Sequence, residues 1–500
     1  MATSRTLAAN RPGTEAGLVK SLGLLDSTTI VMGSMIGSGI FIVAADIARQ
    51  VKSPGLLVLT WVISGVMTVI GAVSYGELAA MMPRAGGQYI YLREAFGPLF
   101  GFLYGWTLFL VIQTGTVAAV AVAFGKFLGV FFPSVSATNY FLSLGALRIA
   151  GYNIPLALST QQLAAILSLL LLSAINIYGI RAGAWVQNIF TTLKVAALLG
   201  IVGLGLHWVL GHAGAANVAS QTPSSPPLTG YALVAAVGVA LVGPLFSSDA
   251  WNNVTFTGAE IKNPRRNLPL ALAVGTLTVC SLYVACNWVY VHVLPFYGSP
   301  HGATVLARGV QYAAEDRVAT AVMQVMFGAH GAALMAAAIM ISTFGCMNGM
   351  LLAGARVYYA MAKDGLFFRQ VSRVHPRFHT PYTSLVVQAV WACLLTLSGT
   401  YSQLLDYVVF AVLLFYILTI AGIFRLRRTR PEWPRPYRAM GYPLLPALYI
   451  VMAMVIEWVL LIHKTGRSLA GLVIVALGIP VYFLWRGKAQ NSTPMSASEE

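Results

Sequence analysis

Charged residues are scarce in this sequence. Asp, Glu, Lys and Arg make up only 9% of its 500 residues, whereas soluble domains carry about 25%. Hydrophobic residues make up 58%, and the mean hydropathy is +0.75. Because so few charged side chains are available to cover a water-exposed surface, the composition excludes an ordinary soluble protein. It predicts an all-α membrane protein that crosses the bilayer many times.

Cysteine is scarce as well, and catalytic motifs are missing from the sequence. The four cysteines lie in apolar stretches, where a thiol is usually a small packing group: Cys280, Cys286, Cys346 and Cys393. We expect no structural disulfide, and no metal, because no His/Cys cluster has ligand spacing. The sequence has no phosphate loop of the G-x-x-x-x-G-K type and no nucleophile with a base at usable spacing. We therefore expect neither an enzyme nor a cofactor.

Apolar runs separated by Pro, Gly and charge clusters divide the chain into about twelve predicted membrane spans. Each span comes close to or exceeds the roughly 20 residues that a helix needs to cross a bilayer. In chain order the expected spans are Ser21–Ala48, Pro54–Met82, Gly97–Phe131, Gln161–Ile180, Trp185–Leu210, Gly230–Ile261, Leu268–Leu294, Gly331–Met361, Pro381–Leu397, Tyr401–Phe424, Tyr442–His463 and Ser468–Trp485.

The positions of Lys and Arg predict the topology. The net charge is +16, and most cations fall in the tails or between spans on the side of the N-terminus. Since positively charged loops stay in the cytoplasm, both termini are expected there, with the protein in a plasma membrane. The charge therefore suits anionic lipid better than nucleic acid, and no basic run is interleaved with aromatic residues.

The first span contains a cluster of glycine and serine, from Gly33 to Gly39 (GSMIGSG). Such a segment can interrupt a helix, and backbone groups freed in hydrocarbon must then line a cavity or hold a ligand. The same cluster contains G-x-x-x-G, between Gly33 and Gly37, which is ordinary for close helix packing. The pattern by itself leaves both interpretations open.

The sixth span has a second interruption, from Gly243 to Asn253 (GPLFSSDAWNN). Pro244 removes a backbone donor, and Asp249 is costly in hydrocarbon unless it faces a cavity. Interruptions in two spans placed five apart indicate an inverted repeat of five plus five helices. The expected divisions are a tail over residues 1–20, a first repeat over 21–210, a second repeat over 230–424, two further spans within 442–485 and a tail over 486–500.

Two interrupted helices that meet form a pocket with two kinds of polar end. The N-terminus of a half-helix presents NH groups suited to a carboxylate, and the C-terminus presents carbonyls suited to an ammonium group. A zwitterionic α-amino acid carries both groups. We therefore expect an amino acid as the substrate, with its side chain sorted by the surrounding walls.

Several stretches of the chain carry a family pattern: Gly33–Phe41 (GSMIGSGIF), Tyr75–Gly87 (YGELAAMMPRAGG), Tyr89–Gly97 (YIYLREAFG), Phe246–Pro269 (FSSDAWNNVTFTGAEIKNPRRNLP) and Ser342–Gly365 (STFGCMNGMLLAGARVYYAMAKDG). At these residues the chain resembles the amino acid, polyamine and organocation transporter superfamily, in its L-amino acid transporter branch. The resemblance implies the LeuT-type fold, with broken first and sixth helices. It also implies secondary transport of L-amino acids by alternating access.

The resemblance further implies roles for residues at both interruptions. NH groups at Gly37, Ser38 and Gly39 would receive the substrate carboxylate. Carbonyls at Met35, Phe246 and Ser247 would hold its amine, and the Phe246 ring would be a gate. The whole expected substrate-binding set is Met35, Ile36, Gly37, Ser38, Gly39, Phe246, Ser247, Ser248 and Asp249.

Lys194 lies so far inside the fifth span that reaching an interface would be strained. Sodium-coupled relatives of this fold hold a cation between helices 1, 5 and 8, and in sodium-independent members a lysine stands there, which Lys194 resembles. Its ammonium would contact carbonyls at the first interruption and hydroxyls on the eighth span, with Ser342 and Thr343 as candidates. The resemblance thus implies transport without sodium, by exchange or with proton coupling. A structural lysine at a helix end is the alternative.

Asp249 departs from the family pattern, in which glycine is common at this position. Its carboxylate could attract a Lys or Arg side chain of the substrate, or accept hydrogen bonds from NH groups freed at the interruption. We favour the second use. Neutral substrates are therefore expected first, with cationic ones as an extension. The alternatives are a cationic amino acid or polyamine carrier, and an amino-acid sensor that does not transport.

The expected partners are the amino acid substrate and the lipid bilayer. Animal members of the branch that pair with a glycoprotein use a cysteine between helices 3 and 4, whereas Gly125–Thr160 contains none. We therefore expect no disulfide-linked heavy subunit, and no nucleic acid. The resemblance implies a stand-alone carrier of a bacterial inner membrane.

Overall fold

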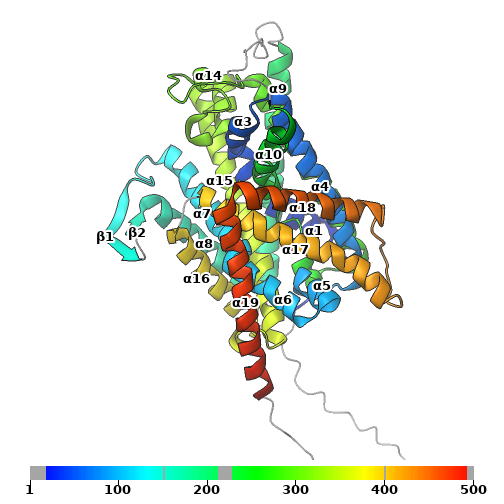
Figure 1. The fold of residues 1–500 in the computed structure, drawn as a ribbon. Helices are drawn as coiled ribbons and strands as arrows, with labels where there is room; N and C mark the ends of the chain where they lie inside the picture. The colour runs from blue at the N-terminus through cyan, green and yellow to red at the C-terminus, as the bar shows by residue number, and fades with distance from the viewer. Residues whose placement is uncertain (1–17, 150–151, 212–227, 399–400, 492–500) are drawn as a thin grey trace, which may run out of the picture.

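The computed structural model describes residues 18–149, 152–211, 228–398 and 401–491, and most of them are helical (Figure 1). In this part of the chain, eleven helices are long and apolar enough to cross a bilayer. Tyr382–Leu397 is a further apolar helix that is shorter than these. The expected all-helical, multi-pass architecture with about twelve spans is confirmed.

The elements of the first half end before residue 212. They are α1 (Leu24–Met35), α2 (Gly39–Ile42), α3 (Ala44–Val51), α4 (Pro54–Met81), α5 (Gln88–Phe96), α6 (Pro98–Thr107), the π-helical turn η1 (Leu108–Ile112), α7 (Gln113–Phe131), β1 (Tyr140–Ile149), β2 (Tyr152–Ser159), α8 (Thr160–Ile177) and α9 (Ile180–Gly211).

The elements of the second half follow residue 228. They are α10 (Gly230–Ala240), α11 (Val242–Ser247), α12 (Asn253–Phe256), η3 (Gly258–Glu260), α13 (Pro264–Val293), α14 (Val305–Arg308), η4 (Ala314–Asp316), α15 (Val318–Lys363), η5 (Arg369–Ser372), α16 (Tyr382–Ser398), α17 (Tyr401–Thr429), α18 (Leu444–His463) and α19 (Thr465–Asn491).

The first span is interrupted between α1 and α2. The amide of Ile36 still donates to the Met32 carbonyl at 2.9 Å, but the amide of Gly37 donates to Met35 at 2.9 Å rather than to Gly33. A β-carbon on Gly37 would lie 3.1 Å from the sulfur of Cys346 on α15. Glycine therefore both breaks the helix and allows a close approach of its neighbour, so the two interpretations left open by the sequence both hold.

The sixth span is interrupted over a shorter stretch than predicted. We expected the interruption from Gly243 to Asn253, but the helix continues through Pro244 to the end of α11, and only residues 248–252 are non-helical. Pro244 cannot donate to the carbonyl four residues earlier, yet the ladder resumes at once, since Leu245 donates to Leu241 at 2.9 Å. The helix direction is lost at Ala250, where φ is +63°, a strained value for a residue with a side chain.

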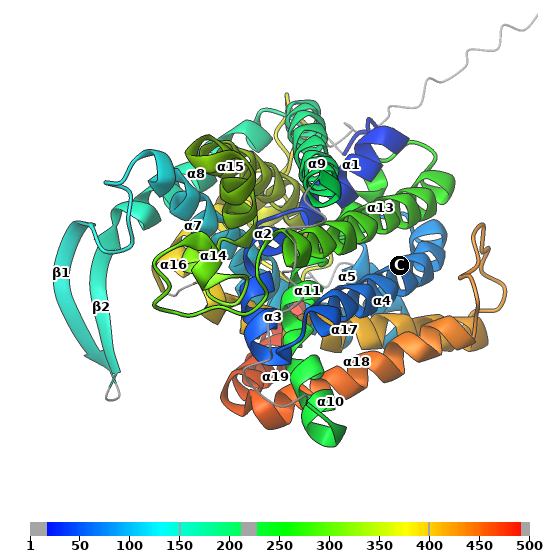
Figure 2. The same ribbon diagram turned by 90° about the horizontal axis from the view of Figure 1, so that it is seen from above.

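Long helices surround the interrupted ones. Seen from above, α2 lies among α1, α13, α15 and α11 (Figure 2). Close packing of α13 depends on glycines: a β-carbon on Gly275 would collide with Val31 of α1, and one on Gly65 of α4 would lie 3.2 Å from Cys280. These contacts place α13 beside the interruption of the first span.

Both ends of the first span are held in place. At one end, the amides of Ser21 and Leu22 donate to the Glu260 carbonyl at 2.9 and 3.0 Å, and the buried Glu260 carboxylate pairs with Arg356 at 2.8 Å. At the other end, Arg49 on α3 pairs with Asp316 at 2.7 Å. These contacts anchor both ends of the first span to the second half of the chain.

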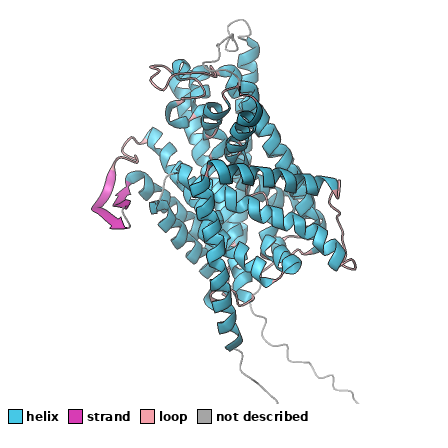
Figure 3. Cartoon of the chain, viewed as in Figure 1, coloured by secondary structure: helices cyan, strands magenta, loops and turns pink. Residues whose placement is uncertain are grey.

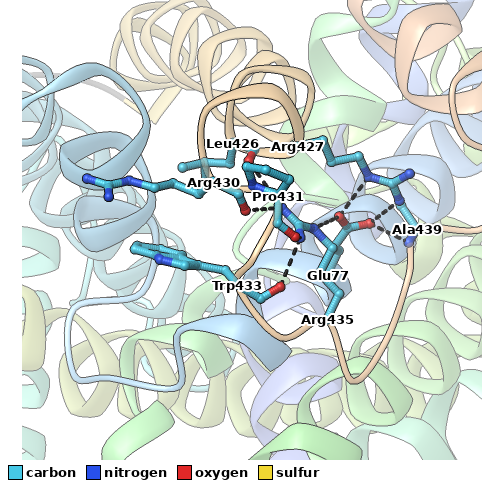
Figure 4. A network of polar contacts seen from close by, with 8 residues as sticks. All are labelled: Glu77, Leu426, Arg427, Arg430, Pro431, Trp433, Arg435 and Ala439. Carbon is cyan, nitrogen blue, oxygen red and sulfur yellow. Dashed lines mark hydrogen bonds and ion pairs between the residues drawn. The ribbon is translucent and has the colours of Figure 1, made fainter.

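Glu77, near the end of α4, holds the segment between α17 and α18 (Figure 4). Its side chain is 1% exposed. Arg427 donates to its two carboxylate oxygens at 2.9 and 2.6 Å, and the Ala439 amide donates at 2.7 Å. Arg435 folds the segment by donating to four backbone carbonyls, those of Leu426, Arg430, Pro431 and Trp433. A buried carboxylate needs such partners, and here they join α4 to α17.

The hairpin of β1 and β2 was not predicted. Its strands pair antiparallel, and it projects away from the helices between α7 and α8 (Figure 3). The stretch from Tyr140 to Ser159 is apolar almost throughout, so it lacks the clear alternation by which a half-buried strand is recognised in a sequence. The pairing therefore became visible only in the structure.

Candidate site at the two helix interruptions

The interruptions of the first and sixth spans meet in the structure. Gly39, the first residue of α2, faces Ser247, the last residue of α11, so closely that a β-carbon on Gly39 would overlap the Ser247 side chain. The Tyr283 hydroxyl, from α13, lies 3.0 Å from the Met35 carbonyl and 3.2 Å from the Ser247 carbonyl. One hydroxyl thus joins the C-terminal ends of α1 and α11.

The start of α2 supplies the amide end of the site. The first NH groups of a helix have no partner within it, and α2 starts at Gly39. Ser38 and Gly39 are both buried. The amide of Gly37 is different, because it donates to the Met35 carbonyl at 2.9 Å. Of the three amides expected at the carboxylate, those of Ser38 and Gly39 lie at the start of α2, and that of Gly37 lies one residue before them.

Lys194 reaches the first interruption from α9. Its Nζ donates to the carbonyls of Gly33 at 2.6 Å, Ile36 at 2.9 Å and Ser342 at 3.4 Å, and the residue is 1% exposed. An ammonium group has three hydrogens, so three carbonyls satisfy it. The expected contact with carbonyls of the first interruption is present, whereas the contact with the eighth span is to the Ser342 backbone carbonyl and not to a hydroxyl. A buried charge with this geometry is not a snorkelling lysine.

The two candidate hydroxyls on α15 differ. Ser342 Oγ donates to the carbonyls of Ile36 and Gly37, at 3.1 and 3.0 Å, so it closes the same group of carbonyls that Lys194 contacts. Thr343 Oγ1 instead donates to Ile339 and Met340 of its own helix, at 2.9 and 3.0 Å. The structure therefore brings Ser342 to Lys194 and leaves Thr343 aside.

A polar seam continues from Lys194 along α9. One helical turn away, Thr191 Oγ1 donates to the Thr29 carbonyl of α1 at 3.2 Å, and Gln187 Nε2 donates to the same carbonyl at 3.3 Å. Asn188 donates to the Asp26 carboxylate at 2.7 Å. This spacing keeps the polar side chains of α9 on the face that contacts α1.

Asp249 lies in the sixth interruption between two cavities. Tyr416 of α17 donates its hydroxyl to the Asp249 carboxylate at 2.6 Å, and the backbone amide of Ala250 is a further hydrogen-bond donor to it. Both cavities are small, and Asp249 and Tyr416 line both. The first also has polar walls from Gln113 and Asn252. Asp249 and Tyr416 thus lie between two small cavities.

Ile36, Phe246 and Ser248, the remaining residues of the predicted set, are buried at the two interruptions. Phe246 is 7% exposed, and its carbonyl accepts a hydrogen bond from the Asp249 amide at 3.2 Å. Ser248 is buried and has Cys280 as a neighbour. The Ile36 carbonyl is shared by Lys194 and Ser342.

Three residues at the site were missed by the sequence reasoning. Tyr283 and Tyr416 lie in apolar helices, where a tyrosine is indistinguishable by pattern from a packing residue. The Cys346 thiol was expected to be a packing group, yet its Sγ lies 3.0 Å from the Ser34 carbonyl. Their nearness to the interruptions appears only in the structure.

A family model described as amino acid permease matches residues 22–479. The chain belongs to that family. It is 29% identical to the serine/threonine exchanger SteT of Bacillus subtilis, over 93% of this chain and 97% of that protein. It is also 29% identical to the large neutral amino acids transporter small subunit 2 of Mus musculus, over 97% of this chain and 85% of that protein. Identity to the b(0,+)-type amino acid transporter 1 of Homo sapiens is 29%, over 94% and 88% of the two chains.

Membership settles the fold class and the general activity. The chain has the LeuT-type fold of five plus five helices with interrupted first and sixth helices. It is a membrane transporter of amino acids and not an enzyme. The predicted resemblance is confirmed.

Proposed function

We propose that this protein is a sodium-independent secondary transporter of L-amino acids, working by exchange or with proton coupling through alternating access. Its substrate would lie between the start of α2 and the end of α11. Neutral amino acids are the first substrates and cationic ones an extension. The observation that carries the proposal is the Lys194 ammonium, which lies on the carbonyls of Gly33, Ile36 and Ser342.

The charge and position of the Lys194 ammonium support transport without sodium. A sodium ion and an ammonium group carry the same charge and are both held by oxygen atoms. Three such oxygens already surround Lys194 Nζ, and adding a second cation there would place two like charges within a few ångströms in a buried site. The fixed ammonium therefore replaces a bound cation and holds α1, α9 and α15 together.

The substrate carboxylate would receive hydrogen bonds at the start of α2, where the amides of Ser38 and Gly39 lie. The dipole of a helix start favours an anion. The amine would lie at the carbonyl ends near Met35 and Ser247. Phe246, buried beside them, would gate the approach from outside.

The preference for neutral substrates rests on the partners of Asp249. Its carboxylate already accepts hydrogen bonds from Tyr416 and Ala250, which supports the bracing use of this residue over a role as counter-charge. Two relatives are named for neutral amino acids, one as a serine/threonine exchanger and one as a transporter of large neutral amino acids, which supports the same preference.

The test is uptake into proteoliposomes. Radiolabelled L-serine, L-leucine and L-arginine are offered with and without trapped unlabelled amino acid, in sodium or choline buffer, and with and without a proton gradient. We expect uptake that depends on trapped substrate or on the proton gradient and is equal in sodium and choline. Stimulation by sodium would contradict the proposal. Binding without any uptake would favour the sensor.

We also propose the topology of the chain, its lack of a disulfide-linked partner and its division into two repeats. The distribution of cations supports termini in the cytoplasm, and the resemblance to stand-alone carriers supports a bacterial inner membrane. Gly125–Thr160 has no cysteine, which supports a carrier without a disulfide-linked heavy subunit, although the mouse relative is named as a small subunit. The repeat boundaries at 21–210 and 230–424 stay a prediction.

A further inference from the structure

The connection between α17 and α18 is strongly basic. Six arginines and one acidic residue, Glu432, lie between residues 425 and 438. The Glu77 carboxylate pairs with two of these arginines, Arg427 at 2.6 Å and Arg435 at 3.5 Å (Figure 4). Ion pairing within the described part of the chain thus involves only two of the six. The other four arginines are exposed: Arg425, Arg428, Arg430 and Arg438.

Exposed arginines of this connection lie at the edge of the apolar part of the two helices. In α17, residues 407–424 include no charged residue, and Arg425 follows them. In α18, the first residue is Leu444, whose side chain is 77% exposed, and Met440 just before it is 66% exposed. Exposed apolar side chains of a membrane span contact hydrocarbon, whereas arginines beside them lie among the lipid headgroups. Arg425 and Arg438 are therefore at headgroup depth.

The buried Glu77 carboxylate draws the two ends of the connection together. Arg427, in the last turn of α17, donates to it at 2.9 and 2.6 Å, and the Ala439 amide donates to it at 2.7 Å. Arg428 and Arg438 are the chain neighbours of these two donors. Two exposed arginines from separate parts of the chain therefore lie close together at the surface.

Arg425 adds a third guanidinium to this surface. It precedes Arg428 by three residues, so both side chains lie on the same face of α17. Its guanidinium carbon lies 5.4 Å from the centroid of the Phe96 ring of α5. A ring contacts the face of a guanidinium, whereas phosphate oxygens bind its N–H edge, so the ring orients the group without occupying its donors. A cation held in this way loses little conformational freedom when an anion binds.

We propose that Arg425, Arg428 and Arg438 form a binding site for the phosphate headgroup of an anionic membrane phospholipid. Guanidinium groups pair with phosphate oxygens through charged hydrogen bonds, often two at a time, and an anionic leaflet attracts basic segments next to a membrane span. The exposed side chains of Met440 and Leu444 contact the acyl chains of the same lipid. The site lies outside the two helix interruptions and does not depend on which solute the protein transports.

The test measures phospholipid binding to the purified protein in detergent by native mass spectrometry. Phosphatidylglycerol and phosphatidylcholine with the same acyl chains are titrated separately onto the unmutated protein, which needs no variant. We expect phosphatidylglycerol to bind more tightly, because its headgroup carries a net negative charge.

A variant then removes the three arginines together, as Arg425→Gln, Arg428→Gln and Arg438→Gln. Each arginine near an anionic surface contributes about fivefold to binding, so this variant should bind phosphatidylglycerol about a hundredfold more weakly. Its binding of phosphatidylcholine should be unchanged, because the net charge of that headgroup is zero.

The matched control replaces Arg369, Arg373 and Arg377 by glutamine. These are exposed arginines between α15 and α16, so the control loses the same charge at another place. It should keep the phosphatidylglycerol affinity of the unmutated protein, and inorganic phosphate should not displace the lipid. Equal affinity of the unmutated protein for the two lipids would overturn the inference, as would an equal loss in both variants. Displacement by inorganic phosphate would also overturn it, by showing a site for a free anion.

Discussion

Replacing Lys194 by alanine should weaken substrate binding about 30-fold. The Gly33 carbonyl would ordinarily accept the Gly37 amide, but that amide donates to Met35, so the ammonium at 2.6 Å is the donor that replaces it. The Ile36 carbonyl keeps the Ser342 hydroxyl at 3.1 Å. The main loss is thus one charged hydrogen bond to a buried carbonyl.

Leaving a buried acceptor without its donor costs about 1–3 kcal/mol. A cost of about 2 kcal/mol, borne by the arrangement of the first interruption that binds the substrate, corresponds to about 30-fold in affinity, because about 1.4 kcal/mol is tenfold. The chain should still fold, since the polar contacts of Thr191, Gln187 and Asn188 continue to hold α9 against α1.

The assay is a binding titration with the best amino acid of the uptake panel, together with a melting curve in detergent. Thr343→Val is the control, because the Thr343 hydroxyl bonds only to carbonyls of its own helix in the described structure. We expect the control to bind normally. A loss of less than about threefold in Lys194→Ala, with the protein folded, would refute the reasoning.

Three further predictions concern the remaining parts of the site and its frame. Gly39→Ala should abolish binding, measured by titration, because its β-carbon overlaps the Ser247 side chain; wild-type affinity would argue against the site. Asp249→Gly should reduce uptake of arginine and leucine equally, because the carboxylate braces the interruption through Tyr416; a selective loss of arginine uptake would instead show a charge that reaches the substrate. Glu77→Ala should lower the stability by about 1–3 kcal/mol, since it leaves the buried Ala439 amide without its acceptor, and an unchanged melting temperature would count against this role.

Much of the architecture follows from local sequence patterns. Hydropathy predicted the spans because each apolar run must satisfy its backbone within a helix. The cluster Gly33–Gly39 and the stretch around Asp249 predicted the interruptions, because glycine, proline and aspartate are unfavourable in a continuous helix that faces lipid. The sixth interruption is shorter than predicted. Pro244 lies near the start of α11, where a proline removes one backbone hydrogen bond without ending the helix.

The partners of the polar groups were predicted less well. Resemblance to a family pattern put Lys194 near the carbonyls of the first interruption, where its ammonium lies, but the division between Ser342 and Thr343 depends on helix rotation. Adjacent residues on a helix point about 100° apart, so only one of them can face the interruption. No sequence pattern sets which one does.

What the sequence by itself determined is therefore the set of helices, their two interruptions and the kind of solute that such interruptions suit, because these depend on each segment's own hydrophobicity and backbone chemistry. Only the tertiary structure decided which groups meet: the ammonium of Lys194 with the carbonyl of Gly33, and the hydroxyls of Tyr283 and Tyr416 with Met35 and Asp249. Those contacts join segments far apart in the chain, and they exist because glycines let the helices approach closely enough for single polar atoms to fall within hydrogen-bond distance.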